Sequence, residues 1–334
     1  MTPLPRIAVT MGDPCGIGPE ITVRAAAHER WRAADTVVVG DADRLRQAAA
    51  LLGLDDVPVE AVPSPGTPAR APGALRVVQT GASTAGLPYG RVSAEAGGAS
   101  YGYVERAVRL ALDGRLDAVV TAPVHKEAWH AAGVPHPDHT SALAALTGAP
   151  RHAMMLATDE LRTVLVTTHL PLAEALTRIT AERVLDTVEL AHAQLRAAGV
   201  ERPRVAVAGV NPHAGEGGLF GDEETRAVLP AVEAARRAGI DASGPHPPDT
   251  VFMRARRGEF DVVVAQYHDQ GLIPVKLLGI EAGVNATLGL PFVRTSVDHG
   301  TAFDLAGTGR ADPGSLLYAL GSALALLGDR GGRS

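Results

Sequence analysis

The sequence contains a single cysteine, Cys15, among 334 residues. One cysteine cannot form a disulfide within the chain, which agrees with a reducing compartment. No apolar run reaches the roughly 18 residues that a membrane helix requires. Residues 1–10 enter a strand pattern without the apolar segment of a signal peptide. We therefore expect a cytoplasmic protein that has no membrane partner.

The sequence also lacks a basic run, and its formal net charge is −6. This balance argues against a nucleic-acid surface and favours small molecules as partners. Lysine is scarce, because Lys126 and Lys276 are the only two among 31 basic residues. A compact ammonium and a planar guanidinium are not interchangeable in a tight site. Both lysine positions are therefore candidates for a functional site.

What the sequence does contain is a regular alternation of strand-like and helical segments. Strand-like runs occupy residues 7–10, 37–39, 75–79, 118–121, 163–167, 204–208 and 262–266, and helical patterns occupy 94–112, 181–198 and 223–237. The alternation predicts an α/β fold with largely parallel, doubly wound sheets, and the length favours two domains. We expect the proline-rich residues 58–72 to form an irregular surface loop and the apolar residues 316–327 to form a core helix.

Three histidines, His169, His213 and His268, each follow a short β-rich run. In open α/β sheets ligands bind beyond the carboxyl ends of the strands, so the three imidazoles are expected to converge there. Neutral imidazole is a common zinc ligand, and three histidines without a fourth protein donor leave coordination positions open for substrate. The pattern predicts a catalytic metal site, although each histidine alone would also fit an ordinary position near a loop.

Three further segments place polar groups at the starts of helices. Residues 10–20 form a glycine-containing turn before a helix that starts near Pro19, where a tight structural turn and a ligand contact both fit. Lys126 follows a strand, where it could lower the pKa of a bound hydroxyl, contact an anion or cap a helix. His139 and Thr140 open another helix and can donate to a phosphate or carboxylate, although capping alone would explain Thr140.

The glycine-dense residues 209–221 suit a loop that wraps a ligand, and we expect Gly215 and Glu216 within it to contact a cofactor. In the following motif, Asp269 could orient an imidazole or a water molecule.

A substrate phosphate needs locally gathered donors in an acidic protein. Lys276, Asn285 and Arg294 are a plausible set, and a structural salt bridge would also explain Arg294.

Together these segments resemble the 4-hydroxythreonine-4-phosphate dehydrogenase family of vitamin B6 biosynthesis. The resemblance spans most of the chain, from residues 10–14 to residues 298–307. It implies an isocitrate/isopropylmalate-dehydrogenase-like fold of two α/β domains with a cleft between them. We expect a first, cofactor-side domain of residues 1–130 plus 297–334, and a second domain of residues 131–296 with the metal, the substrate and the dimer interface. It also implies a homodimer whose active site is shared between the subunits.

The resemblance also assigns site residues. His169 and His213 would bind a divalent metal, either zinc or magnesium or cobalt, together with His268 of the partner subunit. NAD is the implied hydride acceptor, and residues 299–304 are similar to the adenosine-binding loop of the wider dehydrogenase superfamily, which would put Asp304 near the cofactor ribose. The family's substrate-binding positions fall on His139, Thr140, Lys276, Asn285 and Arg294.

The implied reaction is the NAD- and metal-dependent oxidation of 4-phosphooxy-L-threonine at its secondary alcohol, followed by decarboxylation to 3-amino-2-oxopropyl phosphate. The metal would lower the pKa of the hydroxyl and stabilise the enolate that forms when carbon dioxide departs. Candidates for the base are Lys126, Asp269 and Asp249.

One departure from the family pattern concerns the substrate. The family commonly reads Gly-His-Thr-Glu where this chain has Asp138-His139-Thr140-Ser141. A carboxylate that would help to hold an ammonium group has therefore moved by three residues. The same-family alternative is a dehydrogenase for an amine-free substrate, such as 4-phospho-D-threonate, 4-phospho-D-erythronate or an aromatic cis-dihydrodiol.

Two more distant alternatives remain. A phosphate acyltransferase can use a similar two-domain architecture, but it would need an acyl-CoA pocket and no three-histidine metal site. A non-catalytic metabolite-binding protein would keep the cleft without a metal that has open positions.

Overall fold

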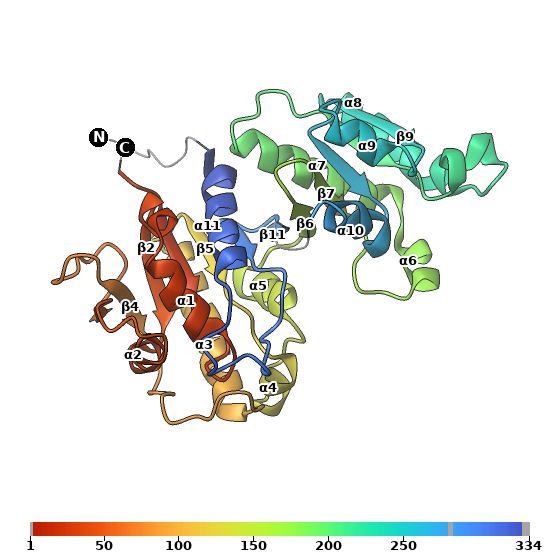
Figure 1. Ribbon diagram of the computed structural model, residues 1–334. Coiled ribbons are helices and arrows are strands. Elements are labelled where there is room, and N and C mark those ends of the chain that lie inside the picture. Colours follow the sequence, from red (N-terminus) through yellow and green to blue (C-terminus); the bar gives the residue numbers. More distant parts are fainter. Residues whose placement is uncertain (1–2, 280–282, 329–334) are drawn as a thin grey trace. The chain divides into compact units, whose positions relative to one another are not determined.

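The structure, a computed structural model, describes residues 3–279 and 283–328. The chain divides into two compact units, unit 1 formed by Met1–Pro150 and Leu290–Ser334 and unit 2 formed by Arg151–Gly289. Each unit combines a mostly parallel run of strands with helices on both sides (Figure 1), so the predicted α/β fold is confirmed. Within the described residues, every helix is too short or too polar to span a bilayer.

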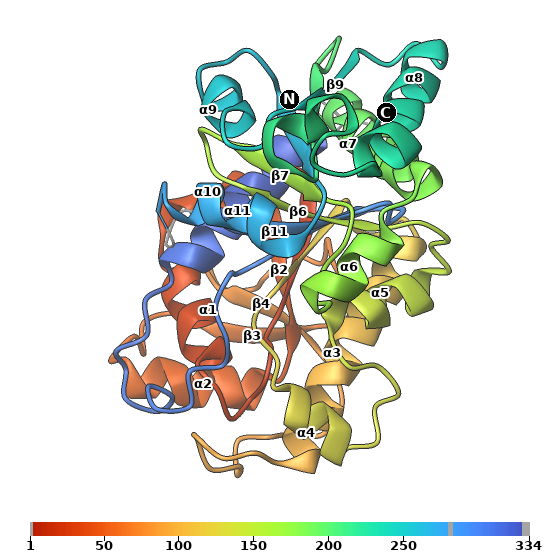
Figure 2. The same cartoon turned by 90° about the vertical axis from the view of Figure 1, so that its right-hand side faces the viewer.

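Unit 1 contains six parallel strands in the order β3-β4-β2-β1-β5-β12. Figure 2 shows α1, α2 and α11 on one side of these strands and α3 and α5 on the other. The elements are β1 (Arg6–Thr10), α1 (Gly18–Ala26), η1 (Glu29–Ala33), β2 (Asp35–Gly40), α2 (Ala42–Leu51), β3 (Val59–Val62), β4 (Leu75–Gln79), α3 (Ala94–Leu112), β5 (Ala118–Thr121), α4 (Lys126–Ala131), α5 (His139–Thr147), β12 (Val293–Ser296) and α11 (Gly314–Leu327).

Unit 2 contains six strands in the order β11-β6-β7-β10-β8-β9. The pairs β11–β6 and β6–β7 are antiparallel, and the remaining pairs are parallel. Figure 2 shows α9 and α10 on one side of these strands and α7 and α8 on the other. The elements are β6 (Ala153–Ala157), β7 (Arg162–Leu165), α6 (Leu172–Arg178), α7 (Ala181–Ala197), β8 (Val205–Ala208), η2 (Pro212–Gly218), η3 (Glu224–Val228), α8 (Leu229–Arg237), β9 (Ala242–His246), α9 (Val251–Arg256), β10 (Val262–Ala265), α10 (His268–Lys276) and β11 (Val284–Leu288).

The cores of both units come from strands that are buried on both faces. All four residues of β5, β8 and β10 are buried, and these strands read as continuous runs of valine, alanine and threonine. Strands covered by helices on both faces need such runs instead of an alternating pattern. In unit 2 the core cluster includes Leu165, Val263 and Leu272. The carboxyl ends of β7, β10 and β8 therefore project from a rigid, well-packed frame.

Two expectations about the fold need correction. Residues 58–72 are not wholly irregular, because β3 lies within them and pairs with β4. The division between the units falls after Pro150 and before Leu290, not after residues 130 and 296. The physical reason is packing: α5 contacts α3, and β12 hydrogen-bonds to β5, so both elements belong to unit 1. His139, Thr140 and Arg294 consequently lie in unit 1.

Candidate active site

Two of the three predicted histidines lie side by side in unit 2. His169 follows β7 and His268 begins α10 after β10, and these two strands are parallel neighbours. Their ring centroids are 5.5 Å apart, and both residues line a cavity of about 280 Å³ together with Tyr267 and Asp269. The carboxyl edge of the sheet thus brings two imidazoles together, as parallel strands with adjacent ends require.

His213 follows β8, which lies on the other side of β10 from β7. Its ring packs 6.3 Å from the ring of Phe220, within the loop that follows β8. In residues 3–279 and 283–328, no three His, Cys, Asp or Glu side chains are placed to hold one metal ion. A three-imidazole site therefore stays a prediction, and the arrangement implied by the family resemblance requires a second chain.

The backbone around two of these histidines is strained. His169 has φ 49° and His213 has φ 54°, in the left-handed region that side chains with a Cβ rarely adopt. Such a conformation costs roughly 1–2 kcal/mol for each residue that is not glycine. Strain of this kind persists where the surrounding structure enforces it, and it concentrates at functional sites. The strain therefore supports a functional role for both histidines.

His268 is oriented by its neighbour. Its Nδ1 atom lies 2.7 Å from Oδ1 of Asp269. A carboxylate that accepts the Nδ1–H fixes the tautomer and leaves Nε2 available as a metal ligand. Asp269 also lines a second cavity, of about 670 Å³, together with Asp249. The two aspartates named as candidates for the base therefore face the same space.

Buried amides connect the segments that follow the strands, and sequence reasoning assigned them no role. Nε2 of Gln266 donates to the carbonyl oxygen of Ala208 at 2.8 Å, and Nε2 of Gln270 donates to that of Gly209 at 2.8 Å. The Thr167 hydroxyl donates to the carbonyl oxygen of Gln266 at 2.8 Å. These bonds tie together the ends of β7, β8 and β10. The sequence signal that could have indicated these bonds is the pair of glutamines, Gln266 and Gln270, on either side of His268.

The loop that carries His213 forms a left-handed turn. Residues 213–218 all have positive φ, and three of the six are not glycine. At roughly 1–2 kcal/mol for each of those three, the turn stores about 3–6 kcal/mol. Gly215 and Glu216, the expected cofactor contacts, lie within this turn. Other interactions must therefore hold the turn in place.

Unit 1 contains a cluster formed by Arg294, His139 and Lys126, in which Arg294 is buried and Lys126 is exposed. Arg294 on β12 is only 4% exposed, and its Nη2 donates to the Thr121 hydroxyl at 2.7 Å. Burial lowers the pKa of Arg294 to about 10, and the charge of Asp138 opposes that shift. Burial also lowers the pKa of His139 well below 6.5, and the charges of Arg294 and Lys126 add to the effect. The cluster is therefore suited to receive an anion.

The helix start at α5 adds to this cluster. His139 packs edge-on against Trp129 with 5.4 Å between the ring centroids, and its buried Nε2 atom has no hydrogen-bond partner among the residues that the structure describes. Asp138 caps the helix, because its Oδ1 accepts hydrogen bonds from the backbone N–H of Ser141 at 2.9 Å and from the Ser141 hydroxyl at 3.0 Å. Thr140 lies in the first turn. The site therefore offers donors for an anion at a helix N-terminus, where the helix dipole favours negative charge.

The other two predicted substrate residues lie in unit 2. Lys276 is exposed at the last position of α10, and Asn285 lies on β11 opposite Leu156. The ammonium group of Lys276 and the side-chain amide of Asn285 can both donate hydrogen bonds to a phosphate or carboxylate. The predicted substrate set is thus divided between the two units.

The turn at residues 10–20 packs against the loop expected to bind the cofactor. Ile17 donates its N–H to the carbonyl oxygen of Thr301 at 3.0 Å. The buried Glu20 carboxylate accepts the N–H groups of Gly307 at 2.5 Å and of Gly309 at 2.8 Å. Asp304 lies exposed on the same loop. The turn that the sequence left open as structural or ligand-contacting therefore anchors residues 301–309.

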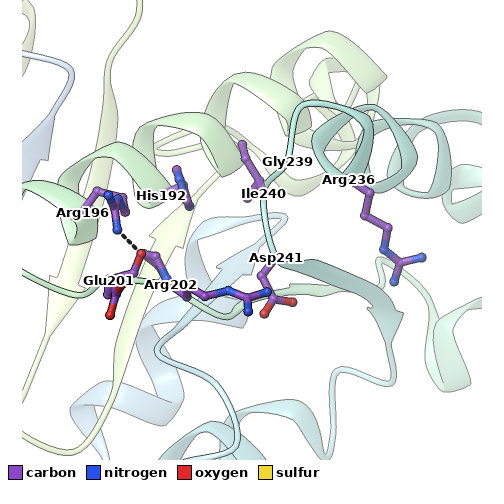
Figure 3. Close-up of a pocket in the computed structure, with 9 residues that line it drawn as sticks. His192, Arg196, Glu201, Arg202, Arg236, Gly239, Ile240 and Asp241 are labelled. Atoms are coloured by element: carbon purple, nitrogen blue, oxygen red, sulfur yellow. Dashed lines mark hydrogen bonds between the residues drawn. The ribbon is translucent and has the colours of Figure 1, made fainter.

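A third cavity, of about 530 Å³ and lined by His192, lies before the amino ends of β8 and β9 (Figure 3), whereas His213 follows the carboxyl end of β8. It carries three arginines and the carboxylates of Glu201 and Asp241. Arg196 donates to the carbonyl oxygen of Glu201, and Arg236 donates to that of Ala242 at 2.7 Å. These two arginines satisfy chain carbonyls near helix ends, and this cavity is not part of the candidate site.

Comparison with known proteins identifies the family. A family model described as pyridoxal phosphate biosynthetic protein PdxA matches residues 32–323. The 4-hydroxythreonine-4-phosphate dehydrogenase of Beijerinckia indica is 54% identical, over 93% of this chain and 91% of the relative. The D-threonate 4-phosphate dehydrogenase of Cupriavidus necator is 51% identical, over 95% of this chain and 96% of the relative. A crystal structure of a 4-hydroxythreonine-4-phosphate dehydrogenase from Klebsiella pneumoniae is 46% identical with a TM-score of 0.90, covering 97% of this chain and 99% of that one. The chain is therefore an oxidoreductase that belongs to the PdxA family, as its motifs predict.

Proposed function

We propose that this enzyme oxidises the secondary alcohol of an amine-free 4-phosphorylated hydroxy acid, such as 4-phospho-D-threonate or 4-phospho-D-erythronate, with NAD. NAD, with Gly215, Glu216 and Asp304 as its expected contacts, would supply the acceptor for the hydride of C3. Loss of the hydroxyl proton to a base would leave a 3-keto acid. Carbon dioxide then departs, and the electron pair of the broken C1–C2 bond remains as an enolate. Protonation of the enolate gives a three-carbon hydroxyketone phosphate.

The anionic substrate class is supported by the cluster in unit 1. Arg294 and Lys126 bring positive charge to His139, whose Nε2 finds no hydrogen-bond partner in the described part of the chain. Burial lowers the pKa of Arg294 even though the charge of Asp138 opposes that shift, so a phosphate or carboxylate would further offset the cost of the buried guanidinium. By the family resemblance we propose Lys276 and Asn285 of unit 2 as further donors for a phosphorylated acid.

The absence of an amine is supported by the state of Asp138. Its carboxylate already accepts two hydrogen bonds from Ser141 and faces the charge of Arg294. It is therefore a poor partner for an ammonium group, and position 141 carries a hydroxyl where the family commonly has a carboxylate. The relative from Cupriavidus necator is named for such a substrate. The capping role of Asp138 is the observation that carries this proposal.

The second candidate substrate is 4-phosphooxy-L-threonine, with 3-amino-2-oxopropyl phosphate as the product. It is favoured by the 54% identity to the Beijerinckia indica enzyme, which is named for that substrate. It would place this enzyme in pyridoxal phosphate biosynthesis.

The histidines of unit 2 fit a divalent metal by their chemistry. His169 and His213 are fixed in left-handed conformations, and Asp269 orients His268. A bound divalent ion would supply a positive charge that lowers the pKa of the substrate hydroxyl and stabilises the enolate. We propose Asp269 or Asp249, which line the same cavity, as the base that takes the hydroxyl proton, and Lys126, whose charge acts on His139, as a contact for an anion.

A second copy of this chain is the proposed partner. Ile273 on α10 is 57% exposed, and Leu277 just beyond it is 81% exposed. Both line the cavity of about 670 Å³ with Met253, another exposed apolar residue. Clustered exposed apolar side chains mark interaction sites. Light scattering on a size-exclusion column is expected to give a dimer, and Ile273→Glu should give a monomer without activity.

The substrate is tested by the absorbance of reduced nicotinamide, with NAD, a divalent metal and each candidate acid in turn. We expect turnover with an amine-free 4-phosphorylated acid and little with 4-phosphooxy-L-threonine. The reverse preference would establish the second candidate. No turnover with any phosphorylated hydroxy acid would refute the proposed reaction.

The capping argument has its own test. The double variant Asp138→Gly and Ser141→Glu restores the common family pattern, and it should gain activity on 4-phosphooxy-L-threonine relative to the amine-free acid. The single variant Ser141→Ala is the matched control, because it adds no carboxylate. An unchanged ratio of kcat/KM values in the double variant would contradict the role given to this position.

A further inference from the structure

The left-handed turn at residues 213–218 is closed around a single buried carboxylate. Glu224 begins η3 and is 5% exposed. Its Oε1 accepts the backbone N–H groups of Val210 and Asn211, both at 2.7 Å, and its Oε2 accepts Nδ2 of Asn211 at 3.0 Å. Three donors from the start of the loop therefore meet one side chain.

The same carboxylate touches the turn from inside. A Cβ atom at Gly215 would lie 2.7 Å from Oε2 of Glu224, and one at Gly209 would lie 3.1 Å from Oε1. The carboxylate therefore occupies the space between the beginning and the middle of the loop, and glycines at both positions make room for it. Phe220 donates its N–H to the carbonyl oxygen of Gly215 at 3.2 Å and closes the turn on the other side.

The contacts of Glu224 continue to the helix of the second histidine. Gln270 on α10 donates to the carbonyl oxygen of Gly209, next to the N–H of Val210 that Glu224 accepts. Gln270 is two residues beyond His268. The carboxylate thus holds the His213 loop in a fixed relation to the segment that carries His268.

We propose that Glu224 is a positioning residue for His213: it is no metal ligand, but it holds the left-handed turn that presents the imidazole. This inference rests on the proposed metal site. A turn with three strained residues that are not glycine relaxes when its anchor is removed, and His213 then loses its fixed position. Partners outside the coordination shell typically change metal affinity 10–100-fold. Glu224 should therefore control metal affinity without touching the metal.

The test is a titration of the full-length protein with Co²⁺ alone, without substrate or NAD, followed by calorimetry and by the visible spectrum of bound cobalt. Glu224→Gln keeps the size of the side chain and places an amide donor against one of the three donors. We expect its Kd for Co²⁺ to rise at least tenfold, and kcat to recover at saturating metal. The control is Glu223→Gln, because Glu223 accepts Nδ2 of Asn211 at 2.8 Å but, within residues 3–279 and 283–328, no backbone N–H of this loop. Its Kd should stay within about twofold of the parent protein.

A second variant separates positioning from loss of the fold. Gly215→Ala leaves Glu224 in place but puts a methyl group 2.7 Å from its carboxylate, in a backbone with φ 79°. It should weaken Co²⁺ binding as Glu224→Gln does, while circular dichroism without metal stays that of the parent. An unchanged Kd in both variants would overturn the inference. If the parent protein binds no divalent ion, the proposed metal site itself fails, and the two failures are distinguishable.

Discussion

Replacing Arg294 by methionine should make the ligand-free protein more stable and unable to bind a phosphorylated acid. Burial on β12 lowers the pKa of this guanidinium well below its ordinary value, to about 10. One pKa unit corresponds to about 1.4 kcal/mol, so holding the charge in the folded protein costs about 3 kcal/mol. At pH 7 the group is still protonated, because that pH lies well below its pKa, and the full cost is present.

Methionine removes the charge and keeps much of the length of the side chain. The variant also loses the polar contacts of Arg294, among them the hydrogen bond to the Thr121 hydroxyl, and such contacts stabilise the fold by about 1 kcal/mol each. The expected net change is a gain of about 1–2 kcal/mol in the free energy of unfolding. Urea unfolding followed by tryptophan fluorescence measures it, because the only two tryptophans, Trp31 and Trp129, both lie in unit 1.

The control is a second buried arginine of unit 1 that has a structural role. Arg44 donates to the carbonyl oxygens of Pro14 at 2.8 Å and of Leu87 at 3.0 Å, so Arg44→Met should lower the free energy of unfolding by a few kcal/mol. A saturating substrate acid should stabilise the parent protein by about 3 kcal/mol at 100 times its Kd, and Arg294→Met by nothing measurable. If Arg294→Met proves less stable than the parent, or keeps the stabilisation by the acid, the assignment of a costly, anion-binding arginine is refuted.

Three further outcomes are expected. Glu20→Gln should speed hydrogen exchange in residues 301–309 and raise KM for NAD while kcat is kept, and unchanged exchange would contradict its anchoring role. Gly97→Ala should lower the free energy of unfolding by more than about 2 kcal/mol, because its methyl group would collide with a backbone carbonyl of α4. The control is Gly98→Ala, whose methyl group meets nothing closer than 3.9 Å and which should be neutral or stabilising in the same urea assay. His139 takes up a proton near pH 6.5 in the unfolded chain, but its pKa is well below that value in the folded chain. The free energy of unfolding should therefore fall by up to about 2 kcal/mol between pH 7 and pH 5, and His139→Gln should flatten that pH profile.

The sequence predicts elements well where burial and local signals agree. The strands at residues 75–79 and 118–121 and the helix at 94–112 have the predicted bounds. In contrast, β3 was missed because prolines flank it and only Val62 of its four residues is buried. The unit boundaries depend on long-range pairing, such as that of β12 with β5, which no local pattern reveals.

The site was predictable in its residue types and less so in its geometry. Three histidines after strands can be read from the sequence, but their mutual distances depend on the order of the strands. Since β7 and β10 are neighbours, His169 and His268 meet, whereas His213 leaves the sheet with a long turn. The sequence did not predict Glu224 as an anchor of that turn, because Glu224 binds backbone groups of another segment. A buried glutamate that follows a glycine-rich loop carries no distinctive spacing.

The chain builds unit 1 from two pieces separated by the whole of unit 2, and this has a consequence for synthesis on the ribosome. Strand β5 ends at Thr121, but its neighbour β12 begins at Val293, about 170 residues later. At roughly 5–20 residues per second, the wait is on the order of 10–30 s. During that time a strand with four core residues presents an unprotected edge, which is a template for pairing with other nascent chains. Unit 2 becomes complete first, so expression should benefit most from chaperones that act before translation ends.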